Sequence, residues 1–262
     1  MRDIGISLYA ASGLSAKEAA KTIKSVGFTK ILLDSTTPEK MKDTAEAVLN
    51  AGLTFDQLHA PFNTINNMWL DNAAAEDTYR DLTDSIDCCV AFGAPTVVIH
   101  LSSGGNPPTI TDIGRARYTR LVEYAAQRNI NIAFENQKYI YNIAWALHDF
   151  KKADNVGFCW DTGHQLCATP DIEFMTLFGD KLICTHLEDN NAVFWEDLHI
   201  LPFDGKFDFN RGVELMKRYN YQGCLTLEVW QNPAFYKDYT PEAFLKRAFD
   251  AANRIRTMMD GE

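Results

Sequence analysis

The sequence predicts an α/β fold, specifically a single-domain (β/α)₈ barrel of the TIM type, on three observations. Short β-rich runs alternate with longer stretches of helical period from one end of the chain to the other. Eight such units of about 30 residues each fit a chain of 262 residues. An open doubly wound sheet is the alternative, but no Gly-x-Gly-x-x-Gly or Gly-Lys-Ser/Thr motif supports its nucleotide-binding forms.

The first half of the chain contains four predicted strand and helix units. Ser15 and Glu18 have the spacing of a capping box, and Pro38 follows Thr37 as a proline does in the first turn of a helix. Gly52 and Gly93 are the stop signals of the second and third helices. The predicted strands are residues 4–8, 30–34, 54–59 and 96–100, and the predicted helices end near residues 26, 52, 92 and 128.

The second half continues the same alternation. The predicted strands are residues 131–135, 156–161, 182–188 and 223–228, with helical segments near 140–152, 171–178 and 210–219. A last helix begins at Thr240-Pro241 and runs to about Met259. No Pro/Ser-rich linker divides the chain, so we expect one barrel domain over residues 1–262.

Charge and composition limit the partners of the protein. The formal net charge of −10 repels nucleic-acid phosphates and anionic lipids, so we expect neither a nucleic-acid nor a membrane partner. The chain begins without a secretory pattern and lacks an apolar run of the ~20 residues that a membrane span needs, which predicts a cytoplasmic protein. The six cysteines predict buried thiols. The oligomeric state stays open between a monomer and a homo-oligomer.

Polar side chains end six consecutive predicted strands, from the third to the eighth. The carboxyl ends of barrel strands converge on one mouth, and burying several carboxylates there is costly unless a cation is present. Carboxylates together with imidazoles suit Mn²⁺, Co²⁺, Zn²⁺ or Mg²⁺. The sequence therefore predicts a catalytic metal centre. The strand-end residues are His59, His100, Glu135, Asp161, His186 and Glu228.

Two of these residues, Glu135 and Glu228, are expected to face each other across the mouth, where they could move protons on opposite faces of a substrate. The long connection over residues 190–208 is expected to act as a lid. Within it, Asp197 and His199 are candidates for further metal ligands or for substrate binding, against the alternative of a solvated acidic loop.

Aromatic residues also fall at strand ends or in the following loops, where their rings could pack on the C–H face of a sugar. Core packing explains any single one equally well. These residues are Tyr9, Phe62, Trp69, Trp160, Trp195, Trp230 and Phe235. A group of four arginines on the fourth predicted helix is expected to form a solvated face; these are Arg115, Arg117, Arg120 and Arg128.

Several of these segments resemble the xylose isomerase-like barrel superfamily, which contains sugar isomerases, ketose 3-epimerases, inositol-catabolic enzymes and the endonuclease IV nucleases. The most specific segments are residues 134–136, 160–164, 186–190, 197–202 and 227–228. The resemblance implies four metal ligands, Glu135, Asp161, His186 and Glu228. It implies acid and base roles for the two glutamates and substrate contact for His164. We also assign His59, His100, Trp195 and His199 to substrate binding.

The resemblance implies a divalent-metal-dependent sugar or polyol isomerase or epimerase. It would bind one Mn, Co, Zn or Mg ion and act by proton transfer through a metal-stabilised enediolate. The best-studied epimerases place an arginine shortly after the seventh-strand histidine. Here residues 190–193 read Asn-Asn-Ala-Val, which leaves the substrate open, and Lys138 is the only nearby cation for a phosphorylated sugar.

The alternative is an endonuclease IV-type zinc phosphodiesterase that acts on apurinic sites. The three-zinc cluster of that branch has nine counterparts here: His59, His100, Glu135, Asp161, His164, His186, Asp197, His199 and Glu228. Three features favour sugar chemistry instead. They are the net charge of −10, the lack of Lys and Arg in the loops after the second and third strands, and the aromatic residues near the mouth.

Overall fold

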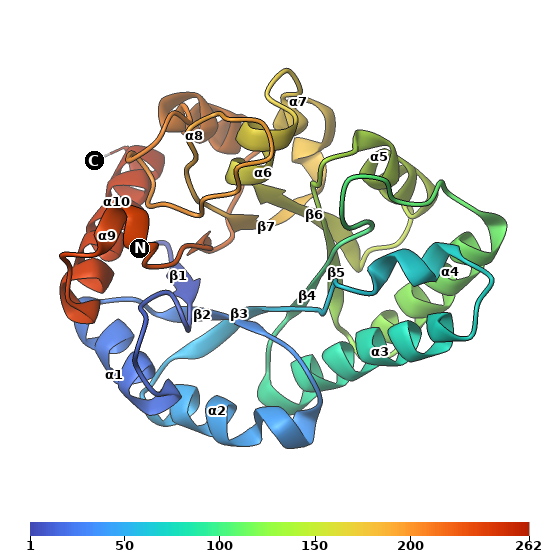
Figure 1. Ribbon diagram of the computed structural model, residues 1–262, viewed down its shortest axis with the longest axis horizontal. Helices are drawn as coiled ribbons and strands as arrows, with labels where there is room; N and C mark the ends of the chain where they lie inside the picture. The colour runs from blue at the N-terminus through green and yellow to red at the C-terminus, as the bar shows by residue number, and fades with distance from the viewer. Residues whose placement is uncertain (262) are drawn as a thin grey trace.

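The computed structural model describes residues 1–261, and within them eight parallel strands form a nearly closed barrel with helices around it (Figure 1). The strand order is β7-β6-β5-β4-β3-β2-β1-β8. A single parallel bridge between Leu187 and Leu227 joins the two end strands. This arrangement confirms the predicted TIM barrel. The strands are β1 (Ile4–Ser7), β2 (Lys30–Asp34), β3 (Thr54–His59), β4 (Thr96–Ile99), β5 (Asn131–Glu135), β6 (Val156–Asp161), β7 (Leu182–His186) and β8 (Leu225–Leu227).

The outer helices begin largely where the capping signals predict. Ser15 and Glu18 form the capping box of α1, and Thr37 caps α2 through its side chain. The helices are α1 (Ala16–Val26), α2 (Pro38–Asn50), α3 (Ala74–Phe92), α4 (Asp112–Ala126), α5 (Ile140–Asp149), α6 (Thr162–Ala168), α7 (Phe174–Phe178), α8 (Phe209–Arg218), α9 (Pro233–Tyr236) and α10 (Pro241–Asp260), with short 3₁₀ turns η1 (Ile65–Trp69) and η2 (Gly179–Lys181).

Helix α6 is the element that matters most for the site and was not expected. It begins directly after β6, because the carboxylate of Asp161 accepts a hydrogen bond from the backbone N–H of His164 at 2.6 Å. One oxygen of Asp161 is therefore used as a helix cap. The same turn brings His164 to the barrel mouth.

Two aromatic residues considered for sugar packing belong to the core instead. Trp69 is 1% exposed, and its indole N–H donates to the Leu101 carbonyl at 2.7 Å. Trp160 is also 1% exposed, and its indole N–H donates to Gln165 Oε1 at 2.8 Å. Core packing, the alternative interpretation, is correct for both.

The predicted solvated arginine face is wrong at Arg117. This guanidinium is buried and donates to the carbonyls of Met68 (3.1 Å) and Leu70 (2.7 Å), at the end of η1. Arg115 and Arg128 instead make partly exposed ion pairs with acidic side chains. All six cysteines are buried and free. No helix within residues 1–261 is long and apolar enough to span a membrane.

Candidate metal centre

Four potential ligands meet at the carboxyl ends of adjacent strands. Glu135 ends β5, Asp161 ends β6, His186 ends β7, and Glu228 directly follows β8. One ligand atom from each of the four lies within 4.8 Å of all the others. Asn136 holds the end of β6 in place, since its amide donates to the Asp161 carbonyl and its oxygen accepts the Asp161 N–H, both at 2.8 Å.

Several buried atoms of this cluster have no hydrogen-bond partner within residues 1–261: Asp161 Oδ2 and both ring nitrogens of His186. His186 Nδ1 lies 3.0 Å from Glu228 Oε2 and 3.3 Å from Glu135 Oε2, yet the geometry of a hydrogen bond is absent. An unsatisfied buried polar group costs about 1–3 kcal/mol. Three carboxylates and one imidazole that converge in this way fit a divalent cation.

The carboxylates of the cluster differ in how easily they ionise. Burial raises the pKa of Asp161 to about 7, and the nearby charges of Glu135 and Glu228 add to this rise against the lowering effect of His164. Burial also disfavours the charged form of Glu228, but the imidazole of His186 outweighs it and lowers the pKa to about 2. Like charges therefore oppose one another here, and a bound cation would relieve that repulsion.

Imidazole nitrogens lie close to both carboxylate oxygens of Glu135. His164 Nδ1 lies 2.7 Å from Oε1, while the Nε2 atoms of His59 and His100 both lie 3.2 Å from Oε2. Gln137 Nε2 donates to Oε1 at 2.9 Å. Burial disfavours the charged form of Glu135, but His100, His186 and His164 outweigh it and lower the pKa of Glu135 well below the usual range. Glu135 is thus held as an oriented carboxylate.

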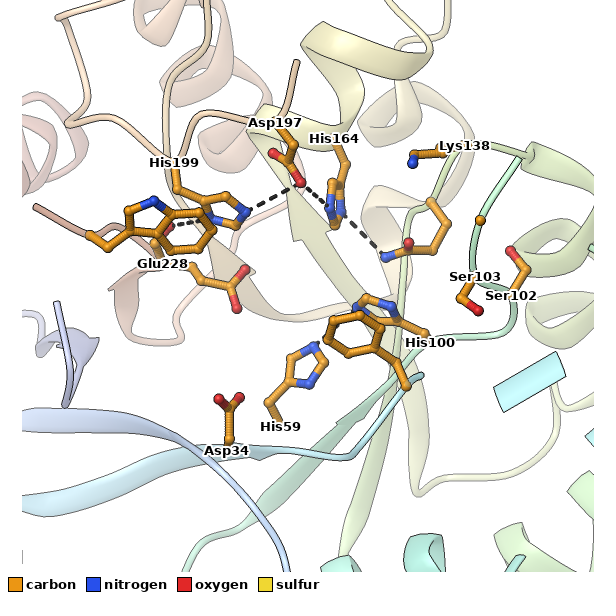
Figure 2. Close-up of a pocket in the computed structure, with 14 residues that line it drawn as sticks. Asp34, His59, His100, Ser102, Ser103, Lys138, His164, Asp197, His199 and Glu228 are labelled. Atoms are coloured by element: carbon orange, nitrogen blue, oxygen red, sulfur yellow. Dashed lines mark hydrogen bonds and ion pairs between the residues drawn. The ribbon is translucent and has the colours of Figure 1, made fainter. Parts of the chain in front are cut away.

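A cavity of about 320 Å³ lies at the barrel mouth, and Glu228 of the cluster lines it (Figure 2). This volume lies at the lower end of the ~300–1,000 Å³ typical of ligand sites and suits a small molecule. Four of the predicted substrate-binding residues line it, whereas Trp195 does not. The lining residues are Asp34, His59, Phe62, His100, Ser102, Ser103, Gly104, Gln137, Lys138, His164, Asp197, His199, Glu228 and Trp230.

Two aromatic rings form apolar walls of this cavity. Phe62 stacks on His100, with ring centroids 4.4 Å apart and planes inclined by 24°. Trp230 stacks on His199, at 3.6 Å and 25°. Such flat faces beside polar groups are suited to the C–H face of a sugar. Of the aromatic candidates, Phe62 and Trp230 are therefore the two that meet the cavity directly.

Three further groups of potential metal ligands adjoin the main cluster or share residues with it. In the first, Asp197 Oδ2 lies 3.1 Å from His164 Nε2 and 3.3 Å from His199 Nε2. His59, His100 and Glu135 form the second group, and Glu135, Cys159 and His186 form the third. The alternative of a solvated acidic loop does not describe Asp197 and His199, because both side chains face the cavity and contact each other.

The connection from β7 to α8 is anchored by Asp189. This buried carboxylate accepts backbone hydrogen bonds from Asn190 (2.8 Å), Phe203 (3.1 Å), Gly205 (3.0 Å) and Phe207 (2.8 Å). The later part of the connection is thereby tied to the barrel. Residues 192–197, by contrast, are exposed.

The sequence reasoning missed functional candidates on several loops. Asp34 ends β2, so the rule used for the later strands could have found it. Ser102 and Gln137 lie just beyond β4 and β5, and only the loop path shows that they reach the cavity. Glu188 is fully buried, its Oε2 lies 2.9 Å from His199 Nδ1, and burial raises its pKa well above the usual range.

The fold and the site together define a TIM barrel with a cluster of carboxylate and imidazole ligands at its mouth. The chain belongs to the xylose isomerase-like TIM barrel family, whose family model matches residues 15–253. It is 28% identical over 191 residues to the uncharacterized protein y4fM of Sinorhizobium fredii, a match that covers 68% of this chain. The chain spans only 60% of the length of that curated relative.

Solved structures share the fold over its whole length. One is an L-ribulose 3-epimerase, with a TM-score of 0.78 and 16% identity over 100% of this chain and 95% of the other. Another is a D-tagatose 3-epimerase-like protein, with a TM-score of 0.75 and 20% identity over 100% and 99% of the two chains. At these identities the likeness establishes the fold alone.

Proposed function

We propose that the protein is a sugar or polyol isomerase or epimerase that depends on one divalent metal ion and works by proton transfer. The observation that carries the proposal is the convergence of Glu135, Asp161, His186 and Glu228, with buried ligand atoms left unsatisfied and with Glu228 lining a small cavity. The names of the neighbouring epimerase structures support the same class of substrate.

A divalent cation held by these four residues would supply Lewis acidity toward a carbonyl and an adjacent hydroxyl of the substrate. Glu228 lines the cavity, where its carboxylate is placed to accept a proton from the C–H beside the carbonyl. Glu135 is covered, with a side chain only 1% exposed. His100 and His164 contact it and also line the cavity, so they connect Glu135 to the substrate.

A substrate screen tests this proposal. Free and phosphorylated ketoses, aldoses and inosose-type ketones are incubated with the protein and Mn²⁺ in D₂O. Proton transfer predicts deuterium at the reacting carbon, and Glu228→Gln is expected to lower the rate by about 10²–10⁴-fold. Glu46→Gln, the same change on the outer face of α2, serves as the matched control.

The outcome that overturns the proposal is the absence of turnover on every class of substrate. Product without solvent deuterium would instead indicate a hydride shift, provided that the abstracted proton exchanges with solvent. Near-normal turnover by Glu228→Gln would remove this residue from the acid and base roles.

A second function, an apurinic-site zinc phosphodiesterase, is favoured by one observation. The groups His59–His100–Glu135 and His164–Asp197–His199 supply ligands beyond those of a single ion. Metal stoichiometry separates the two functions, since the phosphodiesterase requires three zinc ions per chain and the isomerase one. Cleavage of an oligonucleotide that contains an apurinic site, with no activity on sugars, would establish this second function.

A further inference from the structure

We propose that Lys138, Ser102 and Ser103 form a binding site for an anionic end group of the substrate. The chemical class is an oxyanion on a sugar or polyol, either a carboxylate or a phosphate. The inference rests on the proposed function for the sugar part of the molecule. In this arrangement the reacting carbon of the substrate lies above Glu228, and the anionic end of the substrate lies at the opposite side of the cavity.

Lys138 is the only Lys or Arg among the described residues that line the cavity. Its Nζ lies 4.4 Å from the ring centroid of Trp195, in a cation–π contact. Within residues 1–261, no carboxylate approaches this ammonium within the 4.0 Å of a salt bridge. The protein therefore holds a positive charge at the cavity without neutralising it.

Two serine hydroxyls lie on the same side of the cavity as Lys138 (Figure 2). Ser102 is only 2% exposed, and its hydroxyl makes no hydrogen bond within residues 1–261 although the residue lines the cavity. The backbone of Ser103 is fixed, since its N–H donates to Asn66 Oδ1 at 3.0 Å and its carbonyl accepts from Asn66 Nδ2 at 2.9 Å. The loop thus presents hydroxyl donors in a fixed position.

This side of the cavity is held together by contacts between loops. The Tyr139 hydroxyl donates to the Gly105 carbonyl at 2.5 Å. The Trp195 ring packs so closely on Gly105 that an added Cβ would lie 2.3 Å from it. Lys138 and the Ser102–Gly105 loop are therefore positioned before any ligand binds, which lowers the entropic cost of recognition.

The charge distribution gives the ligand an orientation. Asp34 lines the opposite side of the cavity (Figure 2), and its carboxylate would repel an anion there. Lys138 and the serines can donate charge-assisted hydrogen bonds to carboxylate or phosphate oxygens. Neutral hydroxyl groups, by contrast, can donate to Asp34. An anionic sugar would bind in one direction only.

The test uses three small probes that share a carbon skeleton: glycerol, glycerate and glycerol 3-phosphate. Their affinities for the Mn²⁺-loaded protein are measured by calorimetry, and the tryptophan emission, to which Trp195 contributes, is followed in parallel. We expect K138M to weaken the binding of the anionic probes by about 10- to 100-fold and to abolish their effect on emission, with glycerol unchanged. Lys152→Met, the same charge change at an exposed position before β6, is the control.

The probe that loses more affinity in K138M identifies the natural end group as phosphate or carboxylate. The inference is overturned if K138M weakens both anions by less than twofold, or if glycerol binds as tightly as they do. Binding is measured without turnover, so a failure of the proposed isomerase activity would not alter this result.

Discussion

Two sets of buried polar groups lie at the same end of the barrel and differ in how well they are satisfied. Asp189 accepts four backbone hydrogen bonds from the connection that follows β7. Three positions earlier in the chain, both ring nitrogens of His186 lack a hydrogen-bond partner within residues 1–261, and one oxygen of Asp161 lacks one too. Both sets are buried to the same degree.

The difference separates a structural role from a functional one. A buried charge that meets all of its donors stabilises the fold locally, whereas a buried group without partners costs stability unless a ligand supplies the missing contact. An unsatisfied buried group in a native structure calls for an explanation, such as a catalytic role or a bound ion. Substitutions in the two sets should therefore have opposite effects on stability and on metal binding.

The largest effect is expected from Asp161→Asn in the metal cluster. Asparagine keeps an oxygen that can cap α6 but removes the charge, so Mn²⁺ affinity should fall by more than about 100-fold and activity should fall with it. The metal-free variant should be at least as stable as the metal-free wild type, because a repulsive carboxylate is lost. Calorimetric titration and urea unfolding measure the two quantities. A clear loss of apo stability would contradict the comparison.

Asp189→Ala should show the reverse pattern. It leaves four backbone N–H groups without their acceptor and should lower the free energy of unfolding by about 2–4 kcal/mol. Urea unfolding of the metal-free protein measures this loss. Mn²⁺ affinity of the folded variant should change far less than in Asp161→Asn. A stability equal to that of the wild type would show that the anchor is dispensable.

Arg117→Met tests a second satisfied charge, away from the mouth. It removes both hydrogen bonds to the carbonyls at the end of η1, and we expect a loss of about 1–3 kcal/mol in unfolding free energy. Arg120→Met is the matched control, since Arg120 is exposed on the same helix and its guanidinium lies over the ring of Tyr79. An equal effect of the two substitutions would contradict the structural role of Arg117.

The smallest expected effect is a difference in hydrogen-exchange rate between the two parts of the β7–α8 connection. Hydrogen exchange should be fast in the exposed residues 192–194 and slow at the backbone N–H groups of Phe203, Gly205 and Phe207, which Asp189 anchors. Ligand binding should protect only the first part, which confines the predicted lid to that segment. Equal exchange rates in both parts would contradict the distinction between an exposed part and a part anchored by Asp189.

The sequence predicted the fold and the strand ends well because the alternation of apolar runs with capping signals is local information. The bounds of β2, β3, β5 and β6 match the prediction to the residue. The prediction failed where a side chain has a partner far along the chain. The Arg117 guanidinium donates to carbonyls that lie 47 and 49 residues earlier in the chain, and no local sequence pattern indicates such a contact.

Within the site, the residues at the strand ends were predicted, whereas those on the loops were not. Strand-end residues share one mouth in every barrel, so the convergence of Glu135, Asp161, His186 and Glu228 could be expected. The path of the loop after β4 is not encoded in a periodic pattern, and Ser102 was therefore missed. Trp195 was expected at the substrate, but its loop places it on Lys138.

The metal content of the purified protein tests the central claim most directly. Elemental analysis should find one tightly held divalent ion per chain in the wild type and none in Asp161→Asn. Three zinc ions per chain would favour the phosphodiesterase. Metal-free protein that is fully active, or an Asp161→Asn variant that retains as much metal as the wild type, would contradict the account.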